Sequence, residues 1–117
     1  MISVAHRFHG YGSLRGVYQG GQTVRGSQLS LRFRSRGPSK PYRVAVVVSR
    51  KVSKSAVVRN RIRRRIYEVV RQSESSIMSG TDLVITVFDD KLATVEATKL
   101  QSAIQELLQK AAKLAAK

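Results

Sequence analysis

Six arginines lie between positions 59 and 71, and their guanidinium groups could bind the phosphates of a polyanion. A planar guanidinium donates two parallel hydrogen bonds to one phosphate and can also stack on a base. An ordinary solvated helix face mixes both signs of charge, yet Glu68 is the only acid in this stretch. Because like charges packed this closely destabilise a helix, a partner that supplies negative charge is the simplest explanation.

The spacing of apolar residues in the same stretch predicts a helix with one core-facing stripe. At 100° per residue, Val58, Ile66 and Val69 fall within about 40° of Ile62, and Val70 lies at about 80°.

The polar residues of this helix are expected to surround the stripe. Ser55 is placed to cap the N-terminus. Arg59 and Arg65 border the stripe and are expected to lay their stems on the core while their guanidinium groups reach outward. The remaining polar positions are expected to face away from the core: Asn60, Arg61, Arg63, Arg64, Tyr67 and Arg71.

Charge is distributed unevenly along the chain. The net charge is +15, and all seven acids lie from Glu68 onward. This field favours nucleic acid through counterion release, and a protein that neutralises six to ten phosphates loses roughly 10³ to 10⁵ in affinity between low and moderate salt. An anionic membrane is the competing partner, but no stretch approaches the roughly 20 apolar residues of a membrane span. We therefore expect a nucleic-acid partner and no membrane.

Composition indicates one folded domain over residues 1–117. An apolar content of 42% in 117 residues is typical of a single modest core. Residues 1–9 are expected to form a flexible leader without the apolar core of a signal peptide, so a cytoplasmic location is expected. The chain has no cysteine, which excludes disulfides and thiolate zinc sites. We expect no cofactor on the protein itself and no small-molecule substrate.

The remaining segments predict an α+β domain with the order α-β-β-(β)-α-β-α. We expect a short helix over 10–19, a strand over 23–34, and a loop over 35–41 that joins antiparallel strands. A central strand is expected over 42–49 and a last strand over 82–89. Thr94 is expected to cap a final helix that runs to Lys117. The apolar face of that helix comprises Leu100, Ile104, Leu107, Leu108 and Ala111.

These elements predict a mixed sheet with helices packed on it. In the strand over 23–34, Leu29, Leu31 and Phe33 alternate with Ser30, Arg32 and Arg34, so the first three are expected to face the core. The general rule predicts a right-handed crossover through the basic helix.

Residues for hydrolytic chemistry are scarce. A self-sufficient nuclease needs a general base and acid, or clustered carboxylates around a metal. His6 and His9 are expected to be solvated or to face RNA. Asp89 and Asp90 are expected to be acids at the start of a helix. We assign no catalytic residue and no metal ligand to the chain.

The central block resembles the signature of the bacterial ribonuclease P protein subunit. The matching residues are Ser49 to Val52 (SRKV) and Ala56 to Arg64 (AVVRNRIRR), with Arg-Asn-Arg at 59–61. The flanks agree, since Arg7-Phe8, Leu14 and Val17-Tyr18 resemble the opening and first helix of that family. The resemblance implies a ribosomal protein S5 domain 2-like fold, whose left-handed βαβ crossover would override the general rule.

The resemblance also implies a function. The chain would be the non-catalytic protein component of an endoribonuclease, the ribonuclease P holoenzyme, whose RNA holds Mg²⁺ and hydrolyses the 5′ leader from precursor tRNA. Its partners would be ribonuclease P RNA and precursor tRNA. By the same resemblance, the catalytic RNA would be contacted by Arg50, Lys51, Arg59, Asn60, Arg61, Arg63 and Arg64, and the leader by Leu14, Tyr18, Arg32 and Arg34.

Three departures from the family pattern affect these expectations. The turn before the helix, Ser53 to Ser55, is one residue longer than usual. Leu14 and Arg32 stand where the family often has aromatic residues. Leader binding is therefore expected to depend on charge and arginine stacking more than on aromatic stacking. Phe33 is expected in the core, whereas Tyr18 fits a core role and a leader-binding role equally.

Two other function classes share the basic charge. A general RNA-binding or ribosomal protein would have no reason to match the Arg-Asn-Arg block together with the upstream helix. A DNA-binding helix-turn-helix regulator would insert the arginine helix into a major groove. The second class is disfavoured because a strand, and not a scaffold helix, precedes the arginine helix.

Overall fold

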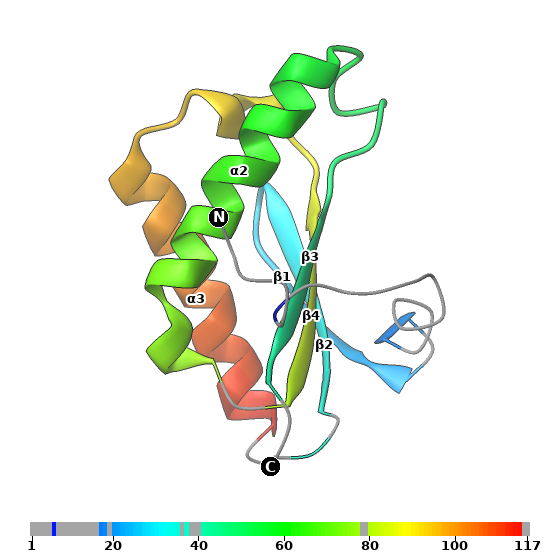
Figure 1. The fold of residues 1–117 in the computed structure, drawn as a ribbon, viewed down its shortest axis with the longest axis vertical. Helices are drawn as coiled ribbons and strands as arrows, with labels where there is room; N and C mark the ends of the chain where they lie inside the picture. Colours follow the sequence, from blue (N-terminus) through cyan, green and yellow to red (C-terminus); the bar gives the residue numbers. More distant parts are fainter. Residues whose placement is uncertain are drawn as a thin grey trace.

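A computed structural model describes residues 6, 17–18, 20–35, 37, 41–77 and 80–115. It has the predicted α+β class, with two long helices beside one sheet (Figure 1). Val17, Tyr18 and Gly20 are helical. The elements are β1 (Gln22–Arg25), β2 (Leu29–Ser35), β3 (Arg43–Val47), α2 (Ala56–Gln72), the 3-10 turn η2 (Glu74–Ser76), β4 (Thr81–Val87), the 3-10 turn η3 (Asp90–Ala93) and α3 (Ala97–Ala115).

The four strands form one mixed sheet in the order β1-β2-β4-β3. β2 is antiparallel to β1 and β4, and β3 is parallel to β4. The predicted single strand over 23–34 is wrong, because the chain reverses after Arg25 and Gly26 N–H donates to the Leu29 carbonyl oxygen over 2.8 Å. The prediction of a central strand over 42–49 is also wrong, since β3 lies at the edge and β4 is inserted between β2 and β3.

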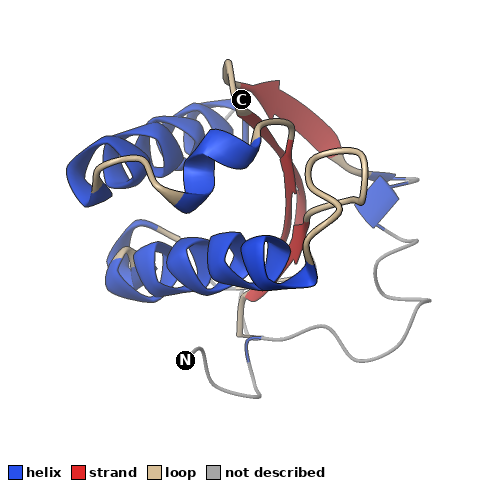
Figure 2. Cartoon of the chain, turned by 90° about the horizontal axis from the view of Figure 1, so that it is seen from above, coloured by secondary structure: helices blue, strands red, loops and turns tan. Residues whose placement is uncertain are grey.

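The crossover from β3 through α2 to β4 is left-handed. In Figure 1, both strands point up the page, β3 is nearer the viewer than β4, and α2 lies on the left of the sheet. Figure 2 shows the same arrangement from above, with α2 and α3 on one face of the sheet. This hand is the one implied by the family resemblance and differs from the general right-handed rule.

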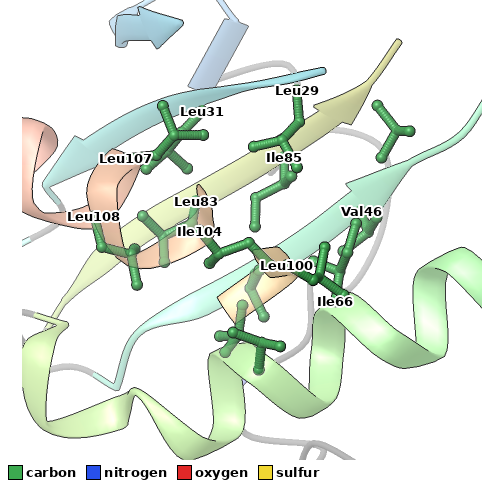
Figure 3. Packing of buried hydrophobic residues seen from close by; sticks show 14 of the residues in the cluster. Leu29, Leu31, Val46, Ile66, Leu83, Ile85, Leu100, Ile104, Leu107 and Leu108 are labelled. Carbon is green, nitrogen blue, oxygen red and sulfur yellow. The ribbon is translucent and has the colours of Figure 1, made fainter. Parts of the chain in front are cut away.

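The core lies between the sheet and the two helices (Figure 3). Of the predicted stripe of α2, Ile62 and Ile66 are fully buried against the core and Val69 and Val70 are buried, whereas Val58 is only half-buried. All five predicted apolar positions of α3 are buried, as is Phe33. Full burial of one such side chain stabilises the fold by about 1.5–3 kcal/mol. The apolar stripes therefore fix which side of α2 is left for solvent.

The segment before α3 differs from the expectation. Thr94 does not cap that helix, which begins at Ala97. Instead, Asp89 caps η3, because its carboxylate accepts a 3.0 Å hydrogen bond from Lys91 N–H. This bond holds the pKa of Asp89 below its usual range. Asp89 is thus an acid at the start of a helical turn, as predicted, and Thr94 ends that turn.

Candidate nucleic-acid interface

The start of α2 orients its first arginines. Ser55 caps the helix as predicted, accepting a hydrogen bond from Val58 N–H at 3.3 Å. Arg59 is half-buried and donates to the Ser53 carbonyl oxygen at 2.9 Å. This bond ties the helix to the turn before it, where Arg50 and Lys51 are exposed. The Arg59 guanidinium, which was expected to reach outward, therefore also holds this turn in place.

The middle of α2 presents arginines to solvent. Arg63 donates to the Asn60 side-chain oxygen at 2.6 Å, so the asparagine orients this guanidinium one turn away. Arg61 and Arg64 are exposed. The structure therefore brings five of the seven residues assigned to the catalytic RNA onto α2, while the other two stand in the exposed turn at its start. The α2 arginine surface comprises Arg59, Asn60, Arg61, Arg63 and Arg64.

Arg65 has a different environment from Arg64. It donates to the Leu92 carbonyl oxygen at 2.6 Å and to the Val95 carbonyl oxygen. These oxygens belong to the connection between β4 and α3, where the backbone needs donors. The prediction that the Arg65 guanidinium reaches outward is wrong, because the connection packs against that side of α2 and binds it.

Two other predicted outward residues also have partners within the protein. Tyr67 is half-buried, and its hydroxyl oxygen accepts from Val46 N–H at 3.3 Å, so it packs toward β3. Arg71 pairs with Glu68 three residues earlier. Their hydrogen bond lowers the pKa of Glu68 and raises that of Arg71. The only acid of α2 is thus paired with Arg71, at the end of the helix away from the Arg-Asn-Arg block.

Two of the residues assigned to the leader, Tyr18 and Arg32, belong to the side of the sheet opposite α2. The register places Thr23, Arg32 and Val84 in one row across β1, β2 and β4, and this row alternates with the core-facing residues. We call this side of the sheet its outer face. The turn that carries Val17 and Tyr18 lies on it in Figure 1, drawn in blue to the right of the sheet.

Arg32 holds this turn in place. Its guanidinium donates to the Val17 carbonyl oxygen at 3.0 Å, the Tyr18 carbonyl oxygen at 2.5 Å and Thr23 Oγ1 at 2.8 Å. Tyr18 is 47% exposed, so its core-packing interpretation is wrong. Arg32 therefore positions the backbone beneath an exposed aromatic ring, and whether it also touches the leader stays a prediction.

Of the two other residues assigned to the leader, the structure describes Arg34 but not Leu14. Arg34 is half-buried and lines a cavity of about 290 Å³ with Gly20, Gln22 and Phe33. Leu14 lies outside the described residues, as does His9. His6 is not solvated as expected, since its ring stacks on Tyr42 with centroids 3.8 Å apart and Nδ1 lies 2.9 Å from the Tyr42 carbonyl oxygen.

Sequence reasoning missed an aromatic residue near the outer face. Phe88 follows β4 and is 47% exposed. Arg25 of β1 lies over its ring, with Cζ 5.8 Å from the centroid. The alternation of β4 assigns Phe88 to the same side as Val84, which could have identified it once the strand was known to be central.

The described residues offer neither a metal-binding cluster nor a membrane-spanning helix. Among them, no cluster of three or more His, Cys, Asp or Glu could hold a metal ion. No helix in the described part of the chain is long and apolar enough to cross a membrane. What the geometry offers is a set of guanidinium groups along α2 on one side of the sheet, and the exposed rings of Tyr18 and Phe88 with nearby arginines on the other.

Comparisons with known proteins identify the family and support the fold. The Ribonuclease P family model matches residues 3–112. The ribonuclease P protein component of Synechococcus sp. is 35% identical over 114 residues, which cover 95% of this chain and 85% of that relative. The RNase P protein of Staphylococcus aureus shares the fold, with a TM-score of 0.78 and 22% identity over 92% of this chain and 95% of its own. That of Thermotoga maritima has a TM-score of 0.73 and 23% identity, covering 83% and 89%. The family match spans nearly the whole chain, which therefore belongs to the ribonuclease P protein family.

Proposed function

We propose that this chain is the protein subunit of a ribonuclease P ribonucleoprotein of the cytoplasm. In this proposal the α2 arginine surface binds the catalytic RNA, and the outer face of the sheet receives the 5′ leader of precursor tRNA. The observation that carries the proposal is the exposure of Arg61 and Arg64 beside an Arg63 oriented by Asn60, in a chain of this family.

The hydrolysis is assigned to the RNA. The described side chains do not fit a Mg²⁺ site, because they include no cluster of carboxylates, so no step of the reaction is routed through them. The role of the arginines is to neutralise phosphates where two RNA molecules approach each other. Less free Mg²⁺ is then needed to hold the catalytic RNA and its substrate together.

The two surfaces suit a subunit that connects two RNA molecules. Helix α2, which carries the arginine surface, and the turn that carries Tyr18 lie on opposite sides of the sheet (Figure 1). Arg32 ties that turn to β2, and Arg59 ties α2 to the turn after β3, so both surfaces are fixed to one rigid framework. A general RNA-binding protein would need only one of these surfaces.

The test is single-turnover cleavage of a precursor tRNA by a bacterial ribonuclease P RNA at limiting Mg²⁺. Wild-type protein is expected to restore cleavage, and Arg61→Ala/Arg64→Ala is expected to restore much less. Both arginines are exposed, so their removal should leave folding intact. Each lost phosphate contact should also lower the slope of log affinity against log salt by about 0.9.

Lys110→Ala/Lys113→Ala provides a charge-matched control. Both lysines are exposed on α3, and the double substitution removes the same net charge away from the α2 arginine surface. This variant should restore cleavage nearly as well as the wild type. Tight binding of the wild-type protein to the RNA without any stimulation of cleavage would instead support the general RNA-binding class.

A further inference from the structure

Phe88 is an exposed aromatic residue at the end of the outer face. Its backbone N–H donates to the Gln28 carbonyl oxygen at 2.8 Å, which extends the pairing of β4 with β2 one residue beyond Val87. Val87 faces the core, so the next side chain points to the outer face. An aromatic ring that is 47% exposed at a fixed backbone position offers a flat surface to a ligand.

Arg25 completes this surface. It pairs with Ser30 in the register of β1 and β2, one row beyond the Thr23 and Arg32 row. Its guanidinium carbon lies 5.8 Å from the centre of the Phe88 ring. A guanidinium over one face of an aromatic ring leaves the other face for a base, and it can bind the phosphate of the nucleotide that stacks there. We call these two residues the Phe88–Arg25 platform.

The platform lies further along β4 than the row of residues that holds the Tyr18 turn. Arg32, which holds the Tyr18 carbonyl oxygen, pairs with Val84 of β4. Phe88 stands four residues further along the same strand, a separation of about 13 Å. At roughly 3.4 Å per stacked nucleotide, and about twice that when extended, this distance corresponds to two to four nucleotides of a single strand.

The surrounding charges favour a single-stranded polyanion over a protein or lipid partner. Arg32 contacts the turn that carries Tyr18, and Arg25 lies over the Phe88 ring, so each of the two aromatic positions has a guanidinium beside it on a chain with a net charge of +15. The nearest acid in sequence, Asp89, has its carboxylate turned to cap Lys91 N–H. A phosphate is therefore expected on the Arg25 side of the ring and not on the Asp89 side.

We propose that the Phe88–Arg25 platform stacks a base of the precursor tRNA leader, two to four nucleotides beyond the contact at Tyr18. The inference rests on the proposed function and deepens it, because it gives the outer face a second aromatic contact. Leader recognition then depends on leader length, since a short leader reaches Tyr18 and not Phe88.

The experiment uses the fact that the chain has no tryptophan, so that Phe88→Trp introduces a single fluorescent reporter. In the assembled holoenzyme, its fluorescence is expected to be quenched by precursor tRNA with a long leader, and not by mature tRNA. Val57→Trp is the matched control, because Val57 is 75% exposed in the first turn of α2. That reporter should respond to the catalytic RNA and not to the leader.

Cleavage kinetics give an independent readout. Phe88→Ala is expected to raise KM about 10-fold for long leaders, with a loss that grows with leader length, whereas Phe88→Tyr should retain wild-type behaviour. The inference is overturned if wild-type protein stimulates cleavage while Phe88→Ala shows the same dependence on leader length. It is also overturned if catalytic RNA alone quenches Phe88→Trp. Failure of the wild type to stimulate cleavage would refute the proposed function itself.

Discussion

Arg43 and Asp82 form a two-pronged ion pair between the parallel strands β3 and β4. Arg43 Nε lies 2.8 Å from Asp82 Oδ1, and Nη2 lies 2.7 Å from Oδ2. The two residues are register partners, and Asp82 is only 1% exposed. The pair thus fixes the alignment of the edge strand on the central strand at the end of the sheet where both strands begin.

Removing one partner of this pair should be costly. Arg43→Met leaves the Asp82 carboxylate buried without the guanidinium, so we expect a loss of about 3 kcal/mol in the free energy of unfolding. The double variant Arg43→Met/Asp82→Leu should recover most of that loss, since no buried charge remains. Urea denaturation of the two single variants and the double variant measures the coupling. Additive losses would contradict the assigned pairing.

Substitution of Arg65 should affect protein stability, whereas substitution of Arg64 should affect RNA binding. Arg65→Ala removes the donors to two backbone carbonyl oxygens and should lower the free energy of unfolding by about 2 kcal/mol. Arg64→Ala should leave stability nearly unchanged but reduce the salt dependence of RNA binding by about one unit of slope. Thermal denaturation and salt titrations of RNA affinity, performed on both variants, check this division. Equal salt slopes would refute it.

The contact between the Tyr18 turn and β2 requires a glycine at position 21. A Cβ there would lie 2.5 Å from the Val17 carbonyl oxygen and 2.8 Å from that of Phe33. Because both atoms belong to the backbone, Gly21→Ala should cost about 2 kcal/mol. Gly20→Ala is the control, since its Cβ would meet only the flexible side chain of Arg34 at 3.3 Å. Denaturation midpoints should fall for the first variant alone.

Arg32→Ala should weaken binding to precursor tRNA more than binding to mature tRNA. The guanidinium makes three hydrogen bonds that hold the turn beneath Tyr18, and no single ammonium group can reproduce that geometry. Arg32→Lys should therefore rescue little. The measurement is the ratio of the two dissociation constants for each variant. An unchanged ratio in Arg32→Ala would show that this turn does not contribute to leader binding.

Stability above about pH 10 should depend on Tyr42. Burial, followed by its hydrogen bond to Glu74 Oε1 at 2.5 Å, raises the pKa of Tyr42 above the ordinary value of 10.0. The neutral phenol is thus favoured in the folded state, so its contribution is complete below pH 10.0 and is lost as pH rises through the higher folded value. The free energy of unfolding of the Tyr42→Phe variant should be about 1 kcal/mol lower than that of the wild type at neutral pH. It should also fall less steeply than that of the wild type as the pH rises above about 10. Urea midpoints across this pH range check both effects.

Local sequence patterns predicted the helices well and the sheet poorly. The stripe of α2 and its Ser55 cap depend on residues within a few positions of one another, as does the apolar face of α3. Which strand is central depends on pairing between distant segments. β3 and β4 are both apolar on two faces, and their sequences do not say which of them pairs with β2.

The same limit applies to the candidate site. The sequence identified the α2 arginine surface because one helix contains it. It placed Arg65 at the border of the apolar stripe and Arg64 on the outward side. It could not show that the Arg65 guanidinium binds the carbonyl oxygens of Leu92 and Val95, because these residues belong to a distant segment of the chain. Phe88 was missed for a related reason, since its exposure depends on where β4 ends and on Arg25, which is 63 residues away by the difference of the two positions.

The central place of β4 constrains how the protein is made. β4 is the strand that pairs with both β2 and β3, so the four-stranded sheet cannot assemble completely before residues 81–87 have left the ribosome. Up to that point β3 has no neighbour among the strands that the structure describes, and the sixteen lysines and arginines of the first 67 residues have emerged before any acid. During synthesis the chain is therefore a polycation with an unpaired strand, close to ribosomal RNA. A nascent chain stalled before residue 81 should remain bound to RNA without a native sheet.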